Sequence, residues 1–358
     1  MLFAPFRRRF LSLVGLVVLS ACTGAKPVSP HSKLADFAIA ENYNGVVLMR
    51  PDRSSTELIK TFGMAEFELS TPVTAKTRFM VGSVSKWITT AAVLRLVEQG
   101  KLDLDKPITT WLPELPAASQ RVTLRALLSN TSGIENGLDL ALKRDRSAVV
   151  MTISPAEAAL LYGSGPLVFT PGTKFDYSVT NWLLVAGIVE RATGEAFTHN
   201  VQRLVFEPAG LTDTGFVDRD GLAPHLAVAY DASHTVRKTT RSPPMVAASG
   251  TMYSTASDLV KLADVIYGNV FLSASSRKEL LSVQHAPEEY ALGGRVKQLG
   301  DESRSRLVAW ETGVSGGYKT LLAYSPLDGR AVVLLNNTDM QQSEQAKLGL
   351  AILYAMDK

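Results

Sequence analysis

Residues 79–100 read FMVGSVSKWITTAAVLRLVEQG, in which a serine and a lysine three residues apart precede a long apolar run. The run from Trp87 to Glu98 is apolar at helical spacing and stops before Gly100, a residue type common at helix ends, so it predicts a helix. If Ser83 lies in the first turn, Lys86 shares its face of the helix. The stretch therefore predicts a hydroxyl and an amine side by side at a helix N-terminus.

This pairing suits nucleophilic catalysis, because a serine hydroxyl is a weak nucleophile unless a neighbouring group accepts its proton. Lys86 can accept the proton of Ser83 if a partly dry pocket lowers the pKa of its amine. The positive end of the helix also favours the developing alkoxide. The motif alone is weak, since a helix cap followed by a surface lysine has the same spacing. A second match, Ser275 to Lys278, lies in a polar run that predicts a solvated helix start.

Strand patterns occur towards both ends of the chain, and helical patterns occupy its middle. The predicted strands are Gly45–Arg50, Glu57–Phe62, Leu307–Trp310, Thr320–Tyr324 and Arg330–Leu335. Further predicted helices are Leu34–Glu41, Asn181–Arg191 and Ser343–Met356, the last with Ser343 as its cap. This order predicts an α+β fold: one antiparallel sheet built from both ends of the chain and flanked by the terminal helices, with a mostly helical lobe inserted at about residues 87–245.

The first 22 residues have the pattern of a targeting segment. The basic cluster Arg7–Arg9 precedes a short apolar stretch, Phe10–Leu19, which is too short to span a bilayer. The next residues, Ser20-Ala21-Cys22, complete a sequence that resembles a bacterial lipobox. We expect 1–21 to be a lipoprotein signal peptide and Cys22 to carry the lipid; an ordinary secretory signal with a chance cysteine is the alternative.

The expected lipid would tie the protein to a membrane of the bacterial envelope. Residues 22–33 contain prolines and no apolar period, so they predict a tether to a catalytic domain at 34–358. Thr23 rather than aspartate follows the cysteine, which by the same resemblance favours the periplasmic face of the outer membrane.

Composition excludes several function classes. The net charge is +3 and the basic residues are scattered, so we expect no nucleic-acid partner. Cys22 is the only cysteine, which excludes an internal disulfide. The five histidines show no ligand spacing, so neither a metal nor another cofactor is expected. These histidines are His31, His199, His225, His234 and His285.

A series of motifs in the remaining chain resembles class C β-lactamases and their serine hydrolase relatives, including β-lactamase-type carboxylesterases and penicillin-binding proteins. The resemblance runs from about Leu34 to the C-terminus, with the motifs in the right order. The matching blocks are FMVGSVSK at 79–86, GKLDLDKP at 100–107, WLPEL at 111–115, LLSNTSG at 127–133, PGTKFDYS at 171–178, SGTMYSTASDL at 249–259 and ETGVSGGY at 311–318. Asn130 stands where histidine is common.

The resemblance implies a role for each matching position. Ser83 attacks a carbonyl and forms an acyl-enzyme, while Lys86 and Tyr177 share the proton transfers. The backbone N–H groups of Ser83 and Val314 form the oxyanion hole. Water, or another acceptor, then takes the acyl group.

Two departures from the family pattern bear on the substrate. The Tyr-x-Asn motif ends here in Val179, so an amide that helps to bind substrate is replaced by an apolar side chain. The Lys-Thr-Gly or His-Thr-Gly motif reads Glu311-Thr312-Gly313, so a carboxylate stands where a cation holds the substrate carboxylate. We expect these four residues to contact substrate and Glu311 to repel carboxylates. Glu311 should also raise the pKa of the Tyr177 phenol; it either pairs with Lys86, leaves Lys86 to act alone, or turns to solvent.

These features predict a serine hydrolase that acts on small-molecule or peptidoglycan-like acyl substrates, with carboxylic esters or amides favoured. The alternatives are a D-Ala-D-Ala carboxypeptidase, a D-aminopeptidase or a weak β-lactamase, and a non-catalytic penicillin-binding-like sensor of the envelope. Residues 313–317 also fit the Gly-x-Ser-x-Gly elbow of α/β-hydrolases. That motif needs a following helix and a later histidine, whereas a strand follows here and the last histidine, His285, lies upstream.

Overall fold

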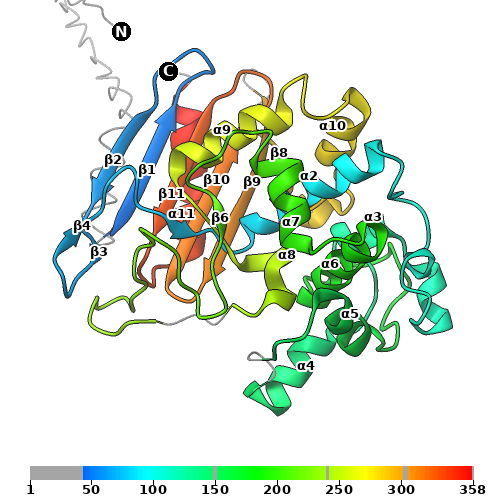
Figure 1. Cartoon of the computed structure of the whole chain (residues 1–358). Coiled ribbons are helices and arrows are strands. Elements are labelled where there is room, and N and C mark those ends of the chain that lie inside the picture. Colours follow the sequence, from blue (N-terminus) through cyan, green and yellow to red (C-terminus); the bar gives the residue numbers. More distant parts are fainter. Residues whose placement is uncertain (1–42, 148–150, 239–241, 301–304, 357–358) are drawn as a thin grey trace, which may run out of the picture.

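The computed structural model describes residues 43–147, 151–238, 242–300 and 305–356. The signal peptide, Cys22, the tether and the predicted helix Leu34–Glu41 lie outside the described residues. Figure 1 shows a sheet on one side of the molecule and a group of helices on the other. The α+β fold and the antiparallel sheet are therefore as predicted.

The main sheet has six antiparallel strands in the order β2-β1-β11-β10-β9-β8. The strands are β1 Gly45–Arg50, β2 Leu58–Phe62, β8 Arg295–Leu299, β9 Arg306–Ser315, β10 Tyr318–Tyr324 and β11 Ala331–Asn336. Strand β1 lies beside β11, with Val46 opposite Leu335, so the two ends of the chain meet in the centre of the sheet. This confirms the prediction that both ends build one sheet.

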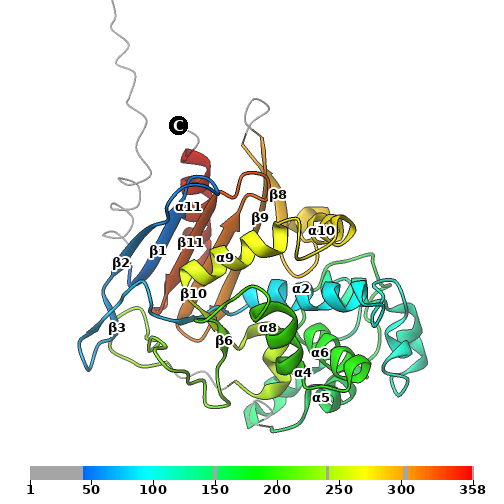
Figure 2. The same cartoon turned by 45° about the horizontal axis from the view of Figure 1, so that its top comes forward.

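Both faces of the central strands are covered. Because side chains alternate along a strand, Val46 and Leu48 of β1 point into the large core, whereas Val47 and Met49 join a smaller one. Helix α9 (Ala256–Tyr267) packs on the large-core side, and α11 (Gln342–Ala355) packs on the other. Figure 2 shows the sheet between these two helices.

The start of the closing helix differs from the prediction. Helix α11 begins at Gln342 with Gln341 as its cap, and no side chain caps its N-terminus. Ser343 thus lies inside the first turn. Burial of the apolar face against β10 and β11, rather than a capping hydroxyl, sets where this helix lies.

The helical lobe lies beside the sheet, and two minor sheets, β3–β4 and β5–β7–β6, complete the fold. The main helices of the helical lobe are α3 Leu124–Leu128, α4 Gly137–Arg144, α5 Pro155–Gly163, α6 Val179–Thr193 and α7 Phe197–Val201. Further helices and strands include α8 Ala247–Gly250, α10 Ala274–Leu281, β3 Met64–Glu66, β4 Thr71–Pro72, β5 Phe79–Met80, β6 Gly215–Phe216 and β7 Met252–Ser254. None of the helices in the described part of the chain is long and apolar enough to cross a bilayer.

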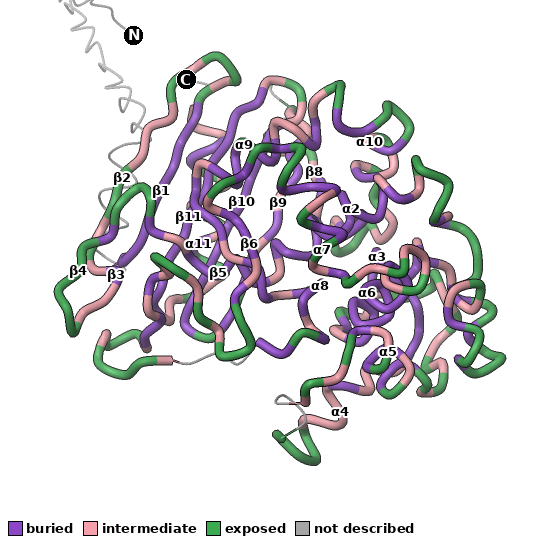
Figure 3. Tube along the Cα trace, in the orientation of Figure 1, coloured by how far each residue is buried: buried purple, intermediate pink, exposed green. Residues whose placement is uncertain are grey.

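Helix α2 (Val84–Glu98) joins the two halves. It is buried on almost every side (Figure 3), as expected for a helix that is apolar all round. It begins at Val84, three residues before the predicted apolar run, and Ser83 occupies its cap position. The N-terminus of α2 therefore presents Ser83 between the sheet and the helical lobe.

Candidate active site

The predicted nucleophile and base lie in contact. Lys86 Nζ is 3.1 Å from Ser83 Oγ, because three residues along the first turn of α2 bring the two side chains to one face. Lys86 is 2% exposed, and its amine also donates a hydrogen bond of 2.9 Å to the carbonyl of Ser249. The amine is thus held at the hydroxyl from which it would take a proton.

Burial prepares Lys86 for this role. Desolvation lowers the pKa of its amine to about 7, and the negative charge of Glu311 opposes part of this shift. A large share of Lys86 is therefore neutral near pH 7, whereas an ordinary lysine amine is almost wholly charged there. A neutral amine can accept the proton of Ser83.

Tyr177 completes the group. It lies two residues before α6, and its ring centre is 4.9 Å from Lys86 Nζ. The residue is 38% exposed, with its phenol at the inner end against Lys86 and Ser83. Desolvation of that end and the charge of Glu311 raise the pKa of the Tyr177 phenol, while a hydrogen bond with Ser83 lowers it in part. The direction agrees with the expectation for a nearby glutamate. A phenol of raised pKa stays protonated at neutral pH, so Tyr177 suits a proton donor better than a base.

Asn130, which the sequence did not mark as functional, holds the Tyr177 segment. Its backbone carbonyl accepts from the N–H of Asp176 at 2.8 Å, and its side-chain oxygen accepts from the N–H of Ser178 at 3.4 Å. These two bonds bracket Tyr177. Asn130 has a φ of 55°, a left-handed conformation that asparagine tolerates better than most residues. Its place in a position where histidine is common was the signal that the sequence offered.

Asn181 supports the same segment. Its side-chain amide donates to Asn130 Oδ1 at 3.2 Å, and its oxygen accepts from Ser132 Oγ at 2.6 Å. It is buried in α6 and does not line the cavity at Ser83. Asn181 therefore does not replace the amide that the family carries two residues after the tyrosine.

Two glycines bring strand β9 against the start of α2. A side chain at Gly313 would place its Cβ 1.9 Å from the carbonyl oxygen of Val81, and one at Gly82 would lie 2.5 Å from the backbone nitrogen of Val314. Gly82 also has a φ of 51°, which disfavours other residues. The backbone of Val314 is thereby placed beside Ser83, as an oxyanion hole built from these two N–H groups requires.

Ser83, Lys86 and Tyr177 face a cavity of about 320 Å³ between the sheet and the helical lobe. Ser83, Lys86, Tyr177 and Val314 line it together with Val179 and apolar residues of α4 and of the segment before α8. The three groups expected to carry the chemistry thus converge on one crevice.

Comparison with known proteins assigns the family. A family model described as Beta-lactamase matches residues 32–356. The chain belongs to the Beta-lactamase family. It is 27% identical over 327 residues to "Putative penicillin-binding protein PbpX" of Bacillus subtilis (strain 168), which covers 90% of this chain and 77% of the relative.

Two further relatives agree with this assignment. "Esterase EstB" of Burkholderia gladioli is 37% identical over 170 residues, or 44% of this chain and 43% of EstB. The crystal structure of a penicillin binding protein from Bacillus halodurans superimposes with a TM-score of 0.75 at 26% identity, over 87% of this chain and 96% of that chain. This Beta-lactamase family member is a serine hydrolase.

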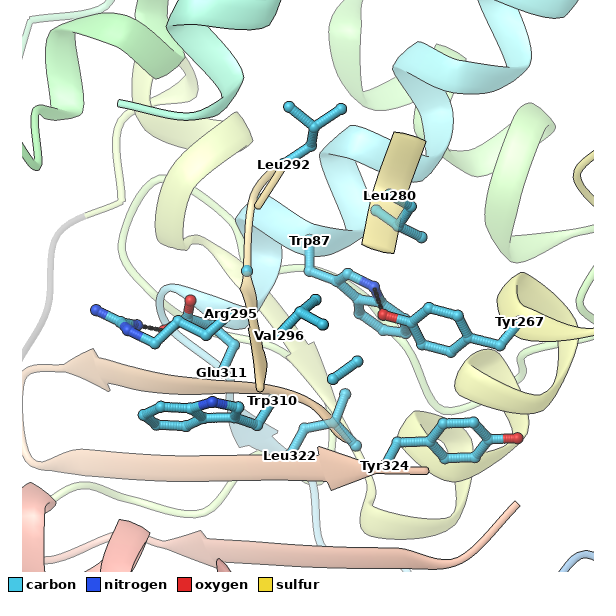
Figure 4. Close-up of a pocket in the computed structure, with 12 residues that line it drawn as sticks. Trp87, Tyr267, Leu280, Leu292, Arg295, Val296, Trp310, Glu311, Leu322 and Tyr324 are labelled. Atoms are coloured by element: carbon cyan, nitrogen blue, oxygen red, sulfur yellow. Dashed lines mark hydrogen bonds and ion pairs between the residues drawn. The ribbon is translucent and has the colours of Figure 1, made fainter. Parts of the chain in front are cut away.

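Glu311 is buried and forms an ion pair inside the protein. It is 3% exposed, and its Oε1 lies 2.7 Å from Nη1 of Arg295 on the neighbouring strand β8 (Figure 4). The N–H of Thr312 donates to the same oxygen at 2.8 Å. Glu311 therefore forms no ion pair with Lys86 and does not turn to solvent. The two expectations that it would do one or the other were wrong. The sequence did not mark Arg295 as part of the site.

The four residues expected to contact substrate do not behave alike. Val179 lines the cavity at Ser83, whereas Glu311, Thr312 and Gly313 are not among its lining residues. Glu311 instead lines a separate cavity of about 10 Å³, drawn in Figure 4, beside Trp87. Gly313 positions the backbone, as described above. Glu311 therefore exposes no surface in the cavity at Ser83 with which it could contact substrate.

The remaining motifs are structural. Ser275 and Lys278 are exposed on α10, as expected for a solvated helix start. Residues 313–317 lie on the hairpin between β9 and β10, so they do not form a nucleophile elbow. Among the described residues, no group of three or more histidine, aspartate or glutamate side chains is arranged to hold a metal ion.

Proposed function

We propose that the protein hydrolyses carboxylic esters, and amides of neutral or cationic acyl groups, through an acyl-enzyme on Ser83. Neutral Lys86 takes the hydroxyl proton as Ser83 Oγ bonds to the substrate carbonyl carbon. The N–H groups of Ser83 and Val314 hold the oxyanion. The proton passes through Tyr177 to the departing alcohol or amine, and a water molecule then releases the acid by the reverse proton path.

One observation carries the choice of substrate. Lys86 is the only charged side chain among the described residues that line the cavity at Ser83, and it is engaged with Ser83 and Ser249. At the position where the family carries a second cation, Glu311 presents a buried carboxylate. A substrate carboxylate would therefore leave water without a compensating charge, which is costly. This disfavours β-lactams and D-Ala-D-Ala ends, and the similarity to Esterase EstB supports an ester.

The contacts at Lys86 favour an enzyme over a sensor. A Lys86 amine 3.1 Å from Ser83 Oγ with a pKa near 7 is arranged for proton transfer. A pure binding protein would not need a buried lysine, because desolvation makes such a group destabilising. The substrate of a D-aminopeptidase carries a cation rather than a carboxylate, so the same cavity does not disfavour it. D-amino-acid amides are therefore among the substrates to be tested.

The test compares four substrate classes on purified protein: short p-nitrophenyl esters, D-amino-acid amides, nitrocefin and D-Ala-D-Ala peptides. We expect kcat/KM to be highest for the esters and a fluorophosphonate probe to label wild type but not Ser83→Ala. Faster turnover of nitrocefin than of the esters would contradict the substrate assignment. Absence of both turnover and labelling would instead support the sensor.

We also propose that the protein is lipid-anchored through Cys22 in the bacterial envelope, at the periplasmic face of the outer membrane. The lipobox-like sequence supports this proposal. The test is membrane fractionation of cells that express wild type or Cys22→Ala, with labelling by radioactive palmitate. Wild type should label and sediment with outer membranes, and the variant should do neither. Labelled protein in the inner membrane would contradict only the assignment to the outer membrane.

A further inference from the structure

A second groove, open to solvent, lies at the end of α2 that is remote from Ser83. It has a volume of about 520 Å³ and is lined by Leu94 and Val97 of α2, the segment 100–106, Trp111 and the first turn of α10. Figure 2 shows this end of α2 close to α10. We call it the distal groove, and we propose that it binds an uncharged glycan strand.

The distal groove is separate from the catalytic cavity. An α-helix rises about 1.5 Å per residue, so Val97 lies roughly 20 Å from Ser83 along the axis of α2. No residue of the described part of the chain lines both spaces. The distal groove is therefore a possible binding site that the chemistry at Ser83 does not use.

The charges that line the distal groove balance. Three cations and three carboxylates contribute to its surface: Lys101, Lys106, Arg125, Asp103, Asp105 and Glu279. Arg125 pairs with Asp105 at 2.7 Å and with Glu279 at 2.5 Å. Lys106 lies 3.9 Å from Asp103. A charged ligand would have to compete with these pairs, whereas an uncharged ligand would not, so the balance favours an uncharged ligand.

Hydrogen-bonding groups remain accessible in the distal groove. The side chain of Asp105 is 67% exposed although both of its oxygens accept from Arg125, and a carboxylate can accept about four hydrogen bonds. Thr110 and Ser275 are exposed residues that line the distal groove with hydroxyl-bearing side chains. Each hydroxyl both donates and accepts, as does every hydroxyl of a sugar. These groups suit a ligand that carries many hydroxyls and no charge.

Trp111 gives the distal groove an aromatic surface. Its side chain packs against the large core, stays only partly buried and lines the distal groove. The face of an aromatic ring is negative, so it attracts the positively polarised C–H groups on the face of a sugar ring. The contact also removes apolar surface from water. A sugar presents a face of C–H groups and an edge of hydroxyls, which matches an indole set among carboxylates and hydroxyls.

Contacts between three segments hold the distal groove in shape. Arg125 of α3 joins the segment 100–106 to α10 through its bonds to Asp105 and Glu279. The backbone N–H of Arg125 also donates to the carbonyl of Leu104 at 2.8 Å. A groove that is formed before its ligand arrives binds with less loss of conformational freedom.

The experiment is isothermal titration of the purified protein with N-acetylchitotetraose, a neutral chain of β-linked sugars. We expect saturable binding at micromolar to millimolar sugar. The affinity should change less than about twofold between about 50 mM and 500 mM salt, because salt does not screen contacts to an uncharged ligand. Absence of saturable binding at millimolar sugar would overturn the proposal. Tighter binding of heparin or polylysine would also overturn it, because the surface would then select charge.

Two variants and a matched control assign the binding to the distal groove. Trp111→Leu keeps an apolar side chain but removes the aromatic face, and should weaken binding by about 30-fold or more. Ser275→Ala should weaken it by about twofold to tenfold through the loss of one hydroxyl, and decides the matter even if Trp111→Leu does not fold. Ser282→Ala should bind like wild type, since Ser282 is exposed at the other end of α10 and does not line the distal groove. Equal affinity in all these proteins would contradict the assignment.

Ester hydrolysis separates the distal groove from the cavity at Ser83. Saturating N-acetylchitotetraose should leave kcat/KM for p-nitrophenyl acetate unchanged, because the two sites lie roughly 20 Å apart. Ser275→Ala should keep the wild-type kcat/KM. Competitive inhibition by the sugar would place it in the cavity at Ser83 and overturn the proposal. If the sugar binds as expected but no ester is cleaved, only the proposed function is refuted.

Discussion

Glu311 and Arg295 form an ion pair inside the protein, with 2.7 Å between Glu311 Oε1 and Arg295 Nη1. Their side chains are 4% and 19% exposed, and Arg295 also lies over the rings of Tyr290 and Trp310. The second carboxylate oxygen of Glu311 is buried and has no hydrogen-bond partner among the described residues. Arg295, which does not line the cavity at Ser83, therefore compensates the negative charge that stands in place of the family's cation.

Removing one member of this pair should destabilise the fold. Glu311→Gln leaves the Arg295 charge poorly compensated, and breaking a buried pair in this way typically costs about 3–5 kcal/mol. We expect urea unfolding to show a loss of this order. The double variant Glu311→Gln/Arg295→Gln should lose less than the sum of the two single variants. Additive losses would show that the two charges do not depend on each other.

Activity should depend on the protonation of Lys86. Because burial lowers the pKa of this amine to about 7, kcat/KM should rise with pH around a midpoint near 7. Glu311 raises this pKa, so Glu311→Gln should move the midpoint to lower pH. The pH profile with an unionisable ester measures both values. A midpoint that moves to higher pH in the variant would contradict the electrostatic assignment.

Burial of Lys86 should lower the free energy of unfolding near neutral pH. Its folded pKa lies below the ordinary 10.5, so between about pH 7 and 10.5 the unfolded chain binds more protons and the free energy of unfolding rises with pH. Lys86→Met should therefore stabilise the protein at pH 7 by roughly 3–5 kcal/mol, with a gain that shrinks towards pH 10. Its kcat/KM should fall by about 10²–10⁴-fold. Denaturant curves at several pH values test the trend, and a stability gain independent of pH would refute it.

Asn130 should act on catalysis through the position of Tyr177. Asn130→Gly keeps the left-handed backbone but removes the oxygen that accepts from Ser178 and Asn181. We expect kcat to fall by about 10–100-fold with little change in KM, because small displacements of a reacting group are costly. Asn130→Asp restores the acceptor and should recover part of kcat. Equal loss in both variants would indicate a general folding defect.

Close packing of Gly313 should be needed for the oxyanion hole. The added Cβ of Gly313→Ala would lie 1.9 Å from Val81 O, so β9 must move away from the start of α2. We expect kcat/KM to fall by about 10²–10³-fold, the usual effect of losing one oxyanion donor. Gly294→Ala is the matched control, since its Cβ would meet neighbours only at 3.8 Å or more. The assignment fails if both variants keep wild-type activity.

Several features of the protein followed from local patterns in the chain. Ser83 and Lys86 meet because helical periodicity alone places residues three apart on one face. The strands at both ends showed their apolar patterns, and the sheet that joins β1 to β11 confirmed them. The predicted cap Ser343 was wrong, because helix boundaries depend on packing as well as on capping residues.

The surroundings of the site depended on contacts between distant parts of the chain. Arg295 meets Glu311 because β8 and β9 pair in a register that places Arg295 opposite Trp310, and no local pattern specifies that register. The clamp of Asn130 on the Tyr177 segment spans 48 residues of sequence from Asn130 to Ser178. The low pKa of Lys86 comes from burial by several elements together. Side-chain periodicity is a property of neighbours along the chain, whereas charge pairing and desolvation arise when remote segments exclude water from the same place.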